Sequence, residues 1–227
     1  SKTTIKKAIE SAEHPILLET VTQLKRAEES WKNCTILGID TEFVRERTYR
    51  AALGLVQISD GNTAWLFDPL AIRTYEPLVR LMENPGTLKL LHSGTEDLEV
   101  LLHAIGVVPE PLVDTQIACA MLGQPLQMGY HHAIKWLFEI EIDKDQTRSN
   151  WCKRPLTKHQ LRYAAMDVVL LPEMYKTLRG RLEESGRLAW LEEDVARMQR
   201  NARSTIDPEK VYQRFSGIGR MDNRTLQ

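Results

Sequence analysis

The sequence predicts an α/β domain whose sheet carries a β-hairpin, and three observations support this fold class. Apolar, β-prone runs cluster in residues 35–93, and helical periodicity dominates residues 95–203. The turn-forming Asp60-Gly61-Asn62 separates two strand-like runs. Strands first and helices afterwards favour one sheet covered by helices. The 227 residues suffice for one large domain, or for one domain with a small second one.

The first half of the chain should contain most of the sheet. Residues 3–32 are expected to form a strand or loop followed by a helix, because apolar residues recur there at helical spacing from Leu17 to Ala27. Strands are expected at 35–41, 53–59, 63–68 and 87–93. Helices are expected at 77–82, 95–104, 112–122 and 129–138.

The second half should be helical after a polar, irregular segment at 141–156. Thr157 and Gln160 form a capping-box pattern that opens a long helix, which should run to about Glu184 with a bend at Pro172. A further helix is expected at 188–203, and Asp207-Pro208 is typical of another helix start.

Composition and charge limit the classes of protein. Hydrophobic residues make up 42% of the chain and charged residues 27%, which is ordinary for a soluble globular protein. No apolar run approaches the roughly 18 residues of a membrane helix, and no secretory signal is expected. Cys34, Cys119 and Cys152 are few and widely spaced, so we expect reduced thiols in a cytoplasmic protein. A net charge of −1 gives nucleic acid no global attraction, so a polyanion would need local basic patches or metal ions.

Two acids end the apolar run ILGIDTEF at residues 36–43. Alternate residues of a strand point to the same face, so Asp40 and Glu42 should lie side by side at the end of a buried segment. Carboxylates this close repel each other unless a cation or a proton lies between them.

Two later elements carry acids at the border of the core. Asp97 lies in the first turn of the helix expected at 95–104, where the helix dipole favours a carboxylate, and Glu99 flanks the same apolar face. A simple helix-start preference is the alternative. Asp167 lies within an apolar stripe of the long helix, one turn after Tyr163. A buried carboxylate must be paired, protonated or bound to a metal ion, and a core ion pair with an arginine is the alternative there.

The ordered set of motifs resembles the DEDD superfamily of 3′–5′ exonucleases. The set is D-x-E ending a strand, an Asp at a helix start, and Y-x-x-x-D inside a helix. Tyr163 indicates the tyrosine-bearing subgroup, because Arg162 stands where the other subgroup has histidine. The resemblance is closest to the bacterial ribonuclease D family and covers roughly residues 15–205. The matching blocks are DTEFVRERTYRAALGLVQI (40–58), LLHSGTEDLEVL (90–101), PLVDTQIA (111–118) and RPLTKHQLRYAAMDVVLLPEMY (154–175). Asn150 departs from the pattern, since many members have Asp there.

The resemblance implies a ribonuclease H-like mixed sheet with a β-hairpin, flanked by helices, and a short C-terminal helical segment. It implies an exonuclease domain at 1–205 and, at 206–227, the start of a truncated helical nucleic-acid-binding domain of the HRDC type. It also implies two divalent metal ions, Mg²⁺ in preference to Mn²⁺, which activate water and stabilise the departing oxygen.

The implied catalytic residues are Asp40, Glu42, Asp97, Tyr163 and Asp167, and the four acids are the implied metal ligands. Asp40 would bridge both ions, while Glu42 and Asp167 would hold the ion that activates water. Asp97 would support the second ion through water, and Tyr163 would orient the attacking water.

The implied activity is that of a 3′–5′ exoribonuclease releasing 5′-mononucleotides from RNA 3′ ends, with transfer RNA precursors as the expected partners. No membrane association and no obligatory protein partner are expected. A DNA exonuclease with the same two-metal site and a non-catalytic nucleic-acid-binding module are the alternatives.

Substrate contacts are less sharply defined by the sequence. Basic side chains follow the first motif and cluster around the start of the long helix, and the alternative is a solvated charged surface. The candidates are Arg45, Arg47, Arg50, Lys153, Arg154, Lys158 and Arg162. Gln57 is a further substrate candidate, with a satisfied core amide as its alternative. We expect His92 to be structural and Asp114 to cap the helix that follows it.

Overall fold

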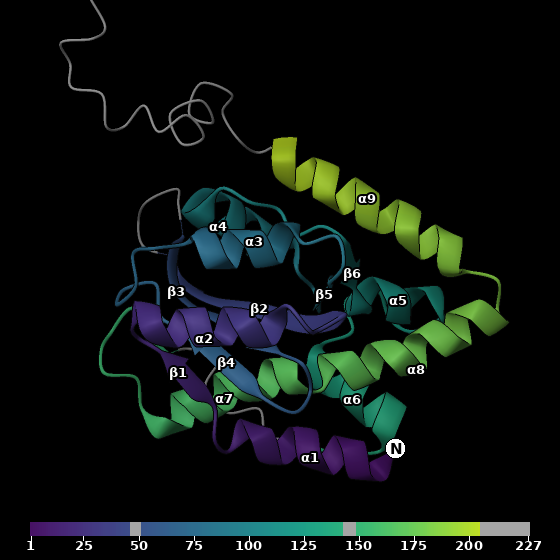
Figure 1. The fold of residues 1–227 in the computed structure, drawn as a ribbon. Coiled ribbons are helices and arrows are strands. Elements are labelled where there is room, and N and C mark those ends of the chain that lie inside the picture. The colour runs from purple at the N-terminus through teal and green to yellow at the C-terminus, as the bar shows by residue number, and fades with distance from the viewer. Residues whose placement is uncertain (46–50, 143–148, 205–227) are drawn as a thin grey trace, which may run out of the picture.

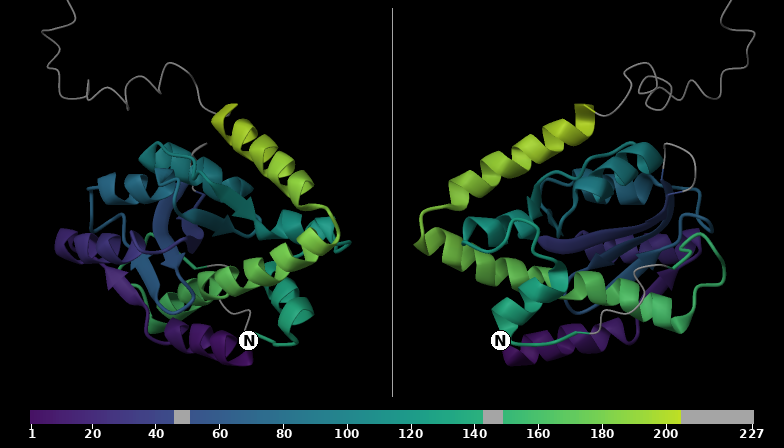
Figure 2. Two further views of the ribbon diagram at one scale, coloured as in Figure 1. Left: turned by 45° about the vertical axis from the view of Figure 1, so that its right-hand side comes forward. Right: turned by 180° about the vertical axis from the view of Figure 1, so that it is seen from behind.

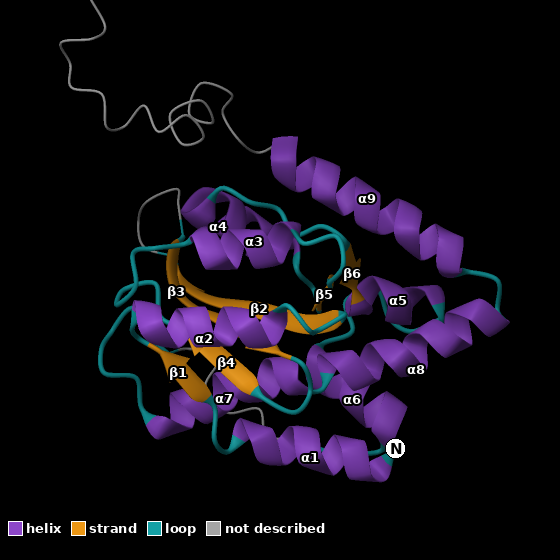
Figure 3. Ribbon diagram, in the orientation of Figure 1, coloured by secondary structure: helices purple, strands orange, loops and turns teal. Residues whose placement is uncertain are grey.

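The computed structural model describes residues 1–45, 51–142 and 149–204. Within these residues, six strands form one mixed sheet in the order β1-β4-β3-β2-β5-β6, and helices cover both of its faces (Figures 1 and 3). The strands are β1 (Ile16–Leu18), β2 (Ile36–Val44), β3 (Ala52–Ser59), β4 (Ala64–Phe67), β5 (Leu88–Leu91) and β6 (Leu112–Asp114). The helices are α1 (Lys2–Ala12), α2 (Val21–Trp31), α3 (Glu76–Glu83), α4 (Thr95–Ile105), α5 (Thr115–Met121), α6 (Tyr130–Phe138), α7 (Lys158–Val169), α8 (Leu171–Glu184) and α9 (Leu188–Ser204).

Strand directions define the class of sheet. Strand β3 runs antiparallel to both of its neighbours, β2 and β4, and the β3–β4 pair is the predicted hairpin. The remaining neighbours, β1 with β4, β2 with β5 and β5 with β6, run parallel. This is the ribonuclease H-like mixed sheet that the resemblance implied, so the predicted fold class is confirmed.

The helices form layers on the two faces of the sheet. Helices α7 and α8 pack along one face, and α4 packs on β2 and β3 from the other (Figure 2). Helix α1 lies on the outer side of α7. Strand β2 is therefore enclosed from both sides, and Leu37 and Ile39 of this strand have no exposed surface.

A glycine allows β2 and the α7–α8 pair to approach closely. A Cβ atom added at Gly38 would lie 2.7 Å from the carbonyl oxygen of Val168 and 3.0 Å from Cβ of Leu171. Any larger residue would push the helices away from the strand. Because Asp40 and Glu42 alternate in phase with Gly38, they face the same helices.

The N-terminal prediction was wrong for two segments. Residues 2–12 form helix α1 rather than a strand or loop, with Ser1 as its N-cap and Ile5, Ala8 and Ala12 on its buried face. Leu17 belongs to strand β1, so helix α2 begins four residues later, at Val21. The apolar spacing of Leu17 fits a helix by coincidence, because a three-residue edge strand leaves no periodicity of its own.

Two predicted helices are divided in the structure. Residues 112–114 form strand β6, and helix α5 begins only at Thr115. The long helix from Thr157 opens with the predicted capping box but ends at Val169, and α8 starts at Leu171. Pro172 lies in the first turn of α8, where its missing N–H needs no partner, so the proline separates two helices instead of bending one.

Other expectations concern membranes, thiols and the chain end. None of the helices in the described part of the chain combines the length and apolarity that a membrane crossing requires. No disulfide joins Cys34, Cys119 and Cys152. Arg47 and Arg50, and the helix expected after Asp207, lie outside the described residues.

Candidate active site

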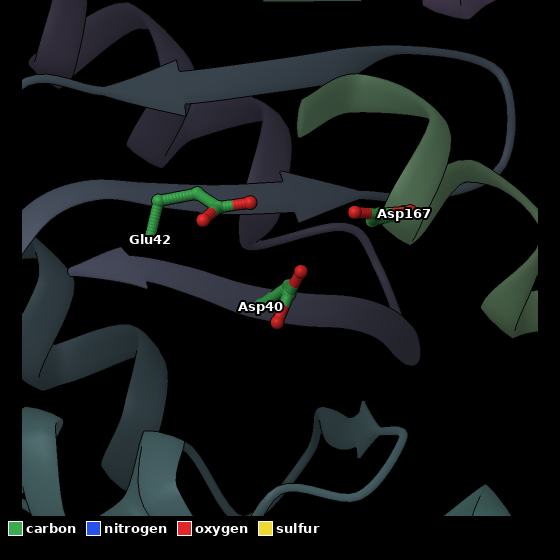
Figure 4. Close-up of side chains that lie close together, drawn as sticks. All are labelled: Asp40, Glu42 and Asp167. Atoms are coloured by element: carbon green, nitrogen blue, oxygen red, sulfur yellow. The ribbon is translucent and has the colours of Figure 1, made fainter. Parts of the chain in front are cut away.

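Three predicted acids converge from two elements. Asp40 and Glu42 lie on β2, and Asp167 reaches them from α7 (Figure 4). One carboxylate oxygen from each lies within 4.8 Å of the others, a spacing at which one metal ion could contact all three. The structure therefore brings together residues that are more than 120 positions apart in the sequence.

Asp97 adjoins this group from the start of α4 and is held there by Thr41. Its Oδ1 atom accepts a hydrogen bond from the Thr41 backbone N–H at 3.1 Å and another from the Thr41 hydroxyl. The β2–β5 ladder ends at the Gly38–Leu90 pair, so the N–H of Thr41 has no strand partner beyond it. Asp97 takes the place of that partner and attaches α4 to the edge of β2.

Burial disfavours the charged forms of all four acids, and repulsion from neighbouring carboxylates adds to this effect at Asp40, Glu42 and Asp97. Burial raises the pKa of Asp40 well above its usual range, and Asp97, Asp167 and Glu42 raise it further by repulsion. Burial likewise raises the pKa of Glu42 to about 8, of Asp167 to about 7 and of Asp97 to about 6. The strongest influences on these four pKa values, among the described residues, include no cationic side chain. Protons or metal ions must therefore balance the cluster.

Asp167 is paired with a tyrosine rather than with an arginine. The Tyr163 hydroxyl, one helical turn earlier, forms a hydrogen bond with the Asp167 carboxylate. Burial and the neighbouring acids raise the pKa of Tyr163 far above its usual value, so the phenol stays neutral and can donate a hydrogen bond. Among the residues that the structure describes, no arginine pairs with Asp167, so the alternative of a core ion pair is not found there.

A cleft of about 660 Å³ opens beside the acids. Asp40, Asp167 and Tyr163 form part of its wall, and Gln116 and Gln127 line it from the α5–α6 region. Its volume lies within the usual range of small-ligand sites, so it can accommodate a nucleotide-sized group next to the carboxylates.

His92 and Asp114 have the structural roles expected from the sequence. The two ring nitrogens of His92 lie 2.8 Å from the Thr115 hydroxyl and 2.8 Å from the Met128 carbonyl oxygen. The Asp114 carboxylate accepts from the backbone N–H of Gln116 at 2.8 Å and so caps α5.

Two predicted substrate contacts require correction. Gln57 has no exposed surface, so it cannot touch a substrate. The guanidinium group of Arg154 forms its hydrogen bonds with other groups of the protein. It donates to both carboxylate oxygens of Asp68 and to the carbonyl oxygens of Trp151, Lys153 and Gly54, at 2.7 to 3.0 Å. These five bonds occupy every N–H of the side chain, which leaves none for a phosphate.

The two remaining arginine candidates lie on the surface. Arg45 forms an ion pair with Glu96 and stacks over the Phe43 ring, and about half of its side chain is exposed. Arg162 donates to Glu13 at 2.7 Å and lines a small surface pocket beside Tyr163. Exposed ion pairs are weak, so both arginines stay candidates for phosphate contacts.

Sequence reasoning missed residues that position the site without belonging to a motif. The Thr41 side chain points to the face of β2 opposite to that of Asp40 and Glu42. Its role is visible only in the structure, where the pairing of β5 with β2 stops before Thr41 and Asp97 accepts the Thr41 hydrogen bonds instead. Trp151 packs against Tyr163, with ring centroids 6.1 Å apart, from the irregular segment before α7. Asn150, the departure from the family pattern, accepts from the Cys152 N–H in the same turn. The sequence did carry one signal for this packing role, because Trp151 is a large aromatic residue within the polar segment at 141–156.

The mixed sheet and the cleft lined by clustered carboxylates are features of a class of nucleases. Comparison of the sequence with protein families supports the same class. The family model for a 3′–5′ exonuclease matches residues 15–183, and the chain belongs to this family. Ribonuclease D from Pseudomonas paraeruginosa is 46% identical over 182 residues, which are 80% of this chain and 48% of that protein. The chain thus spans about half the length of the curated relatives it matches, and the resemblance to ribonuclease D is confirmed.

Solved structures agree in fold. The crystal structure of Escherichia coli ribonuclease D matches with a TM-score of 0.83 and 35% identity, covering 94% of this chain and 57% of that one. Brucella melitensis NrnC with bound Mg²⁺ matches with a TM-score of 0.65 and 28% identity, covering 84% of this chain and 90% of that one.

Proposed function

We propose that this chain carries the catalytic domain of a metal-dependent 3′–5′ exoribonuclease that releases 5′-mononucleotides from RNA 3′ ends. The observation that carries the proposal is the convergence of Asp40, Glu42 and Asp167 in a half-buried cluster beside an open cleft. The similar Escherichia coli enzyme is described as an exoribonuclease involved in structured RNA processing, which supports RNA as the substrate.

The residues present fit divalent metal ions. All the available ligand atoms are carboxylate oxygens, which Mg²⁺ and Mn²⁺ prefer, and the bound Mg²⁺ of the related Brucella protein supports this choice. Asp40, Glu42 and Asp167 would hold one ion, and Asp97, fixed by Thr41, would support a second. When bound, such ions lower the pKa of a coordinated water and stabilise the charge that develops on the phosphate.

The protein's own groups orient the reaction. Tyr163 is neutral and is held by Asp167 on one side and packed by Trp151 on the other. Its hydroxyl can therefore hydrogen-bond the attacking water and fix its direction without removing a proton. The cleft keeps the terminal nucleotide against this group, and its phosphate faces the carboxylates.

The finer substrate assignment extends the resemblance to ribonuclease D, whose Escherichia coli member is described as acting in structured RNA processing. We propose precursors of transfer RNA, with Arg45 and Arg162 contacting phosphates along the approach to the cleft. Residues 1–205 would form the nuclease domain, and residues 206–227 would begin a helical nucleic-acid-binding domain.

The test uses the chain with an RNA of defined sequence labelled at its 3′ end, in Mg²⁺. The wild-type chain should release labelled 5′-mononucleotide, and Asp40→Asn should abolish the release. Glu99→Gln removes a helix α4 acid outside the cluster and should leave the rate unchanged. Full activity of Asp40→Asn would refute the proposal, and faster cleavage of a matched DNA would favour the DNA exonuclease.

A further inference from the structure

The side-chain amide of Gln57 has no partner although it lies in the centre of the sheet. Gln57 is the sixth residue of β3 and has no exposed surface. Neither its Nε2 nor its Oε1 atom has a hydrogen-bond partner in the structure. Buried amides are almost always paired, because an unpaired one loses its hydration without compensation. This residue therefore needs a reason beyond packing.

The strand register identifies the group that can pair with Gln57. Its direct cross-strand partners are Asp40 on β2 and Leu66 on β4. Side chains at directly opposed positions lie on the same face, with Cβ atoms about 4.5–5.5 Å apart. Leu66 is apolar and buried, so Asp40 is the one polar side chain among these two partners.

Gln57 can supply the orienting hydrogen bond that a metal-binding carboxylate at Asp40 would require. A carboxylate that binds metal must hold its oxygens in a fixed direction, and a hydrogen bond from outside the ligand set commonly does this. The Nε2 group of Gln57 carries two N–H donors and no charge, so it can orient a carboxylate without displacing a cation. A leucine of similar size would fill the same space without an unpaired amide.

We propose that Gln57 is a positioning residue whose side-chain amide, unpaired in this structure, donates a hydrogen bond to the Asp40 carboxylate once metal is bound and holds it in the direction that metal binding requires. The inference rests on the proposed function, because it assigns Gln57 a role only where Asp40 is a ligand. It replaces the sequence-based expectation that Gln57 contacts the substrate.

The test compares metal affinity with stability in the full chain. Gln57→Leu should weaken Mn²⁺ binding about 10- to 100-fold, measured by titration calorimetry without substrate. Its thermal midpoint in EDTA should equal or exceed that of the wild type, because the change removes an unpaired buried amide. A purely structural role gives the opposite pattern, a lower midpoint with unchanged Mn²⁺ affinity, and would overturn the inference.

Ser59→Ala is the matched control, since Ser59 lies on the same strand and the same face. Its hydroxyl donates to the Thr63 carbonyl oxygen at 2.7 Å and accepts from the Gly61 N–H at 3.0 Å. This variant should lower the midpoint and leave Mn²⁺ affinity unchanged.

A second variant protects the test against misfolding. If Gln57→Leu does not fold, Gln57→Met is measured in the same way, and wild-type affinity in the folded variant would overturn the inference. Wild-type protein that binds no Mn²⁺ would instead refute the proposed function. Loss of Mn²⁺ binding in Asp40→Asn, together with full binding in the Gln57 variants, would refute only the role of Gln57.

Discussion

Thr41 and Asp97 are 56 residues apart in the sequence, and two hydrogen bonds join them at a single oxygen atom. The backbone N–H and the hydroxyl of Thr41 both donate to Oδ1 of Asp97, and these bonds lower the Asp97 pKa against the effect of burial. Thr41 lies between Asp40 and Glu42, so the residue that separates two candidate ligands also fixes a third acid.

Replacing Thr41 with valine should impair metal use more than stability. Thr41→Val keeps the shape of the side chain but removes one donor, which should lower stability by about 1 kcal/mol. The Asp97 pKa should rise and its carboxylate should lose its fixed direction, so more Mg²⁺ should be needed for half-maximal activity. Thr41→Ser keeps the hydroxyl and should behave like the wild type. Identical Mg²⁺ dependence in the two variants would show that the hydroxyl has no role.

Arg154 and Asp68 provide a second test, because the structure assigns them to the fold. Asp68 is 2% exposed, and the Nε and Nη2 atoms of Arg154 lie 2.7 and 2.8 Å from its two oxygens. Arg154→Met would leave a buried carboxylate unpaired, so stability should fall by about 3 kcal/mol. The salt dependence of RNA binding should stay as in the wild type, because no phosphate contact is lost.

Arg162→Met is the matched comparison on the surface. Its exposed pair with Glu13 should contribute less than about 1 kcal/mol to stability. A lost phosphate contact on a single strand should reduce the slope of log affinity against log salt by about 0.7. A changed slope in Arg154→Met, with stability intact, would restore Arg154 as a substrate contact. Salt titrations of RNA binding and chemical denaturation measure both quantities.

Local rules explain what could be predicted from the sequence. Strand alternation places Asp40 beside Glu42, and helical periodicity places Tyr163 one turn before Asp167. Both relationships depend only on residues within one element, so no knowledge of packing is needed. The convergence of the two elements was available only from the resemblance, because no local rule joins β2 to α7.

Tertiary packing explains what could not be predicted. The sequence is compatible with Gln57 as a substrate contact or as a core amide, and only the sheet order shows that its side chain is enclosed. Arg154 lies in a basic cluster, and only the position of the β3–β4 hairpin reveals its partner, Asp68. The break at Leu170 has a similar cause. Pro172 is compatible with a bend or with a new helix start, and the close packing of β2 on Val168 accompanies the start of a new helix.

Removal of the Tyr163 hydroxyl should slow hydrolysis without weakening RNA binding. Tyr163→Phe keeps the ring that packs on Trp151 and loses the hydroxyl group that we assign to orienting the attacking water. The rate at saturating RNA should fall on the order of 100-fold, as expected for loss of a precise reacting geometry. Tyr175→Phe changes a buried tyrosine of α8 and should have no effect on the rate. Single-turnover rates and filter binding separate the two effects, and a wild-type rate for Tyr163→Phe would remove this residue from the mechanism.

The acid cluster should make the metal-free protein less stable as the pH rises. The pKa values of Glu42, Asp167 and Asp97 are raised to about 8, 7 and 6, and the pKa of Asp40 is raised well above its usual range. The ordinary pKa values of these groups in an unfolded chain are about 4. Between these limits the folded state binds more protons than the unfolded state, so the free energy of unfolding decreases with increasing pH.

Denaturation of the wild-type chain in EDTA should therefore show the greatest contribution from these acids below about pH 4 and its progressive loss toward pH 8. Mg²⁺ or Mn²⁺ binds the deprotonated carboxylates, so the stability gained on adding metal should be larger at pH 8 than at pH 6, with protons released on binding. Asp167→Asn removes one of the titrating groups and should reduce the slope in EDTA. A metal-free stability that is the same at pH 5 and pH 8, in the wild type and in Asp167→Asn alike, would show that these carboxyl groups titrate normally and do not form the strained cluster on which metal binding depends.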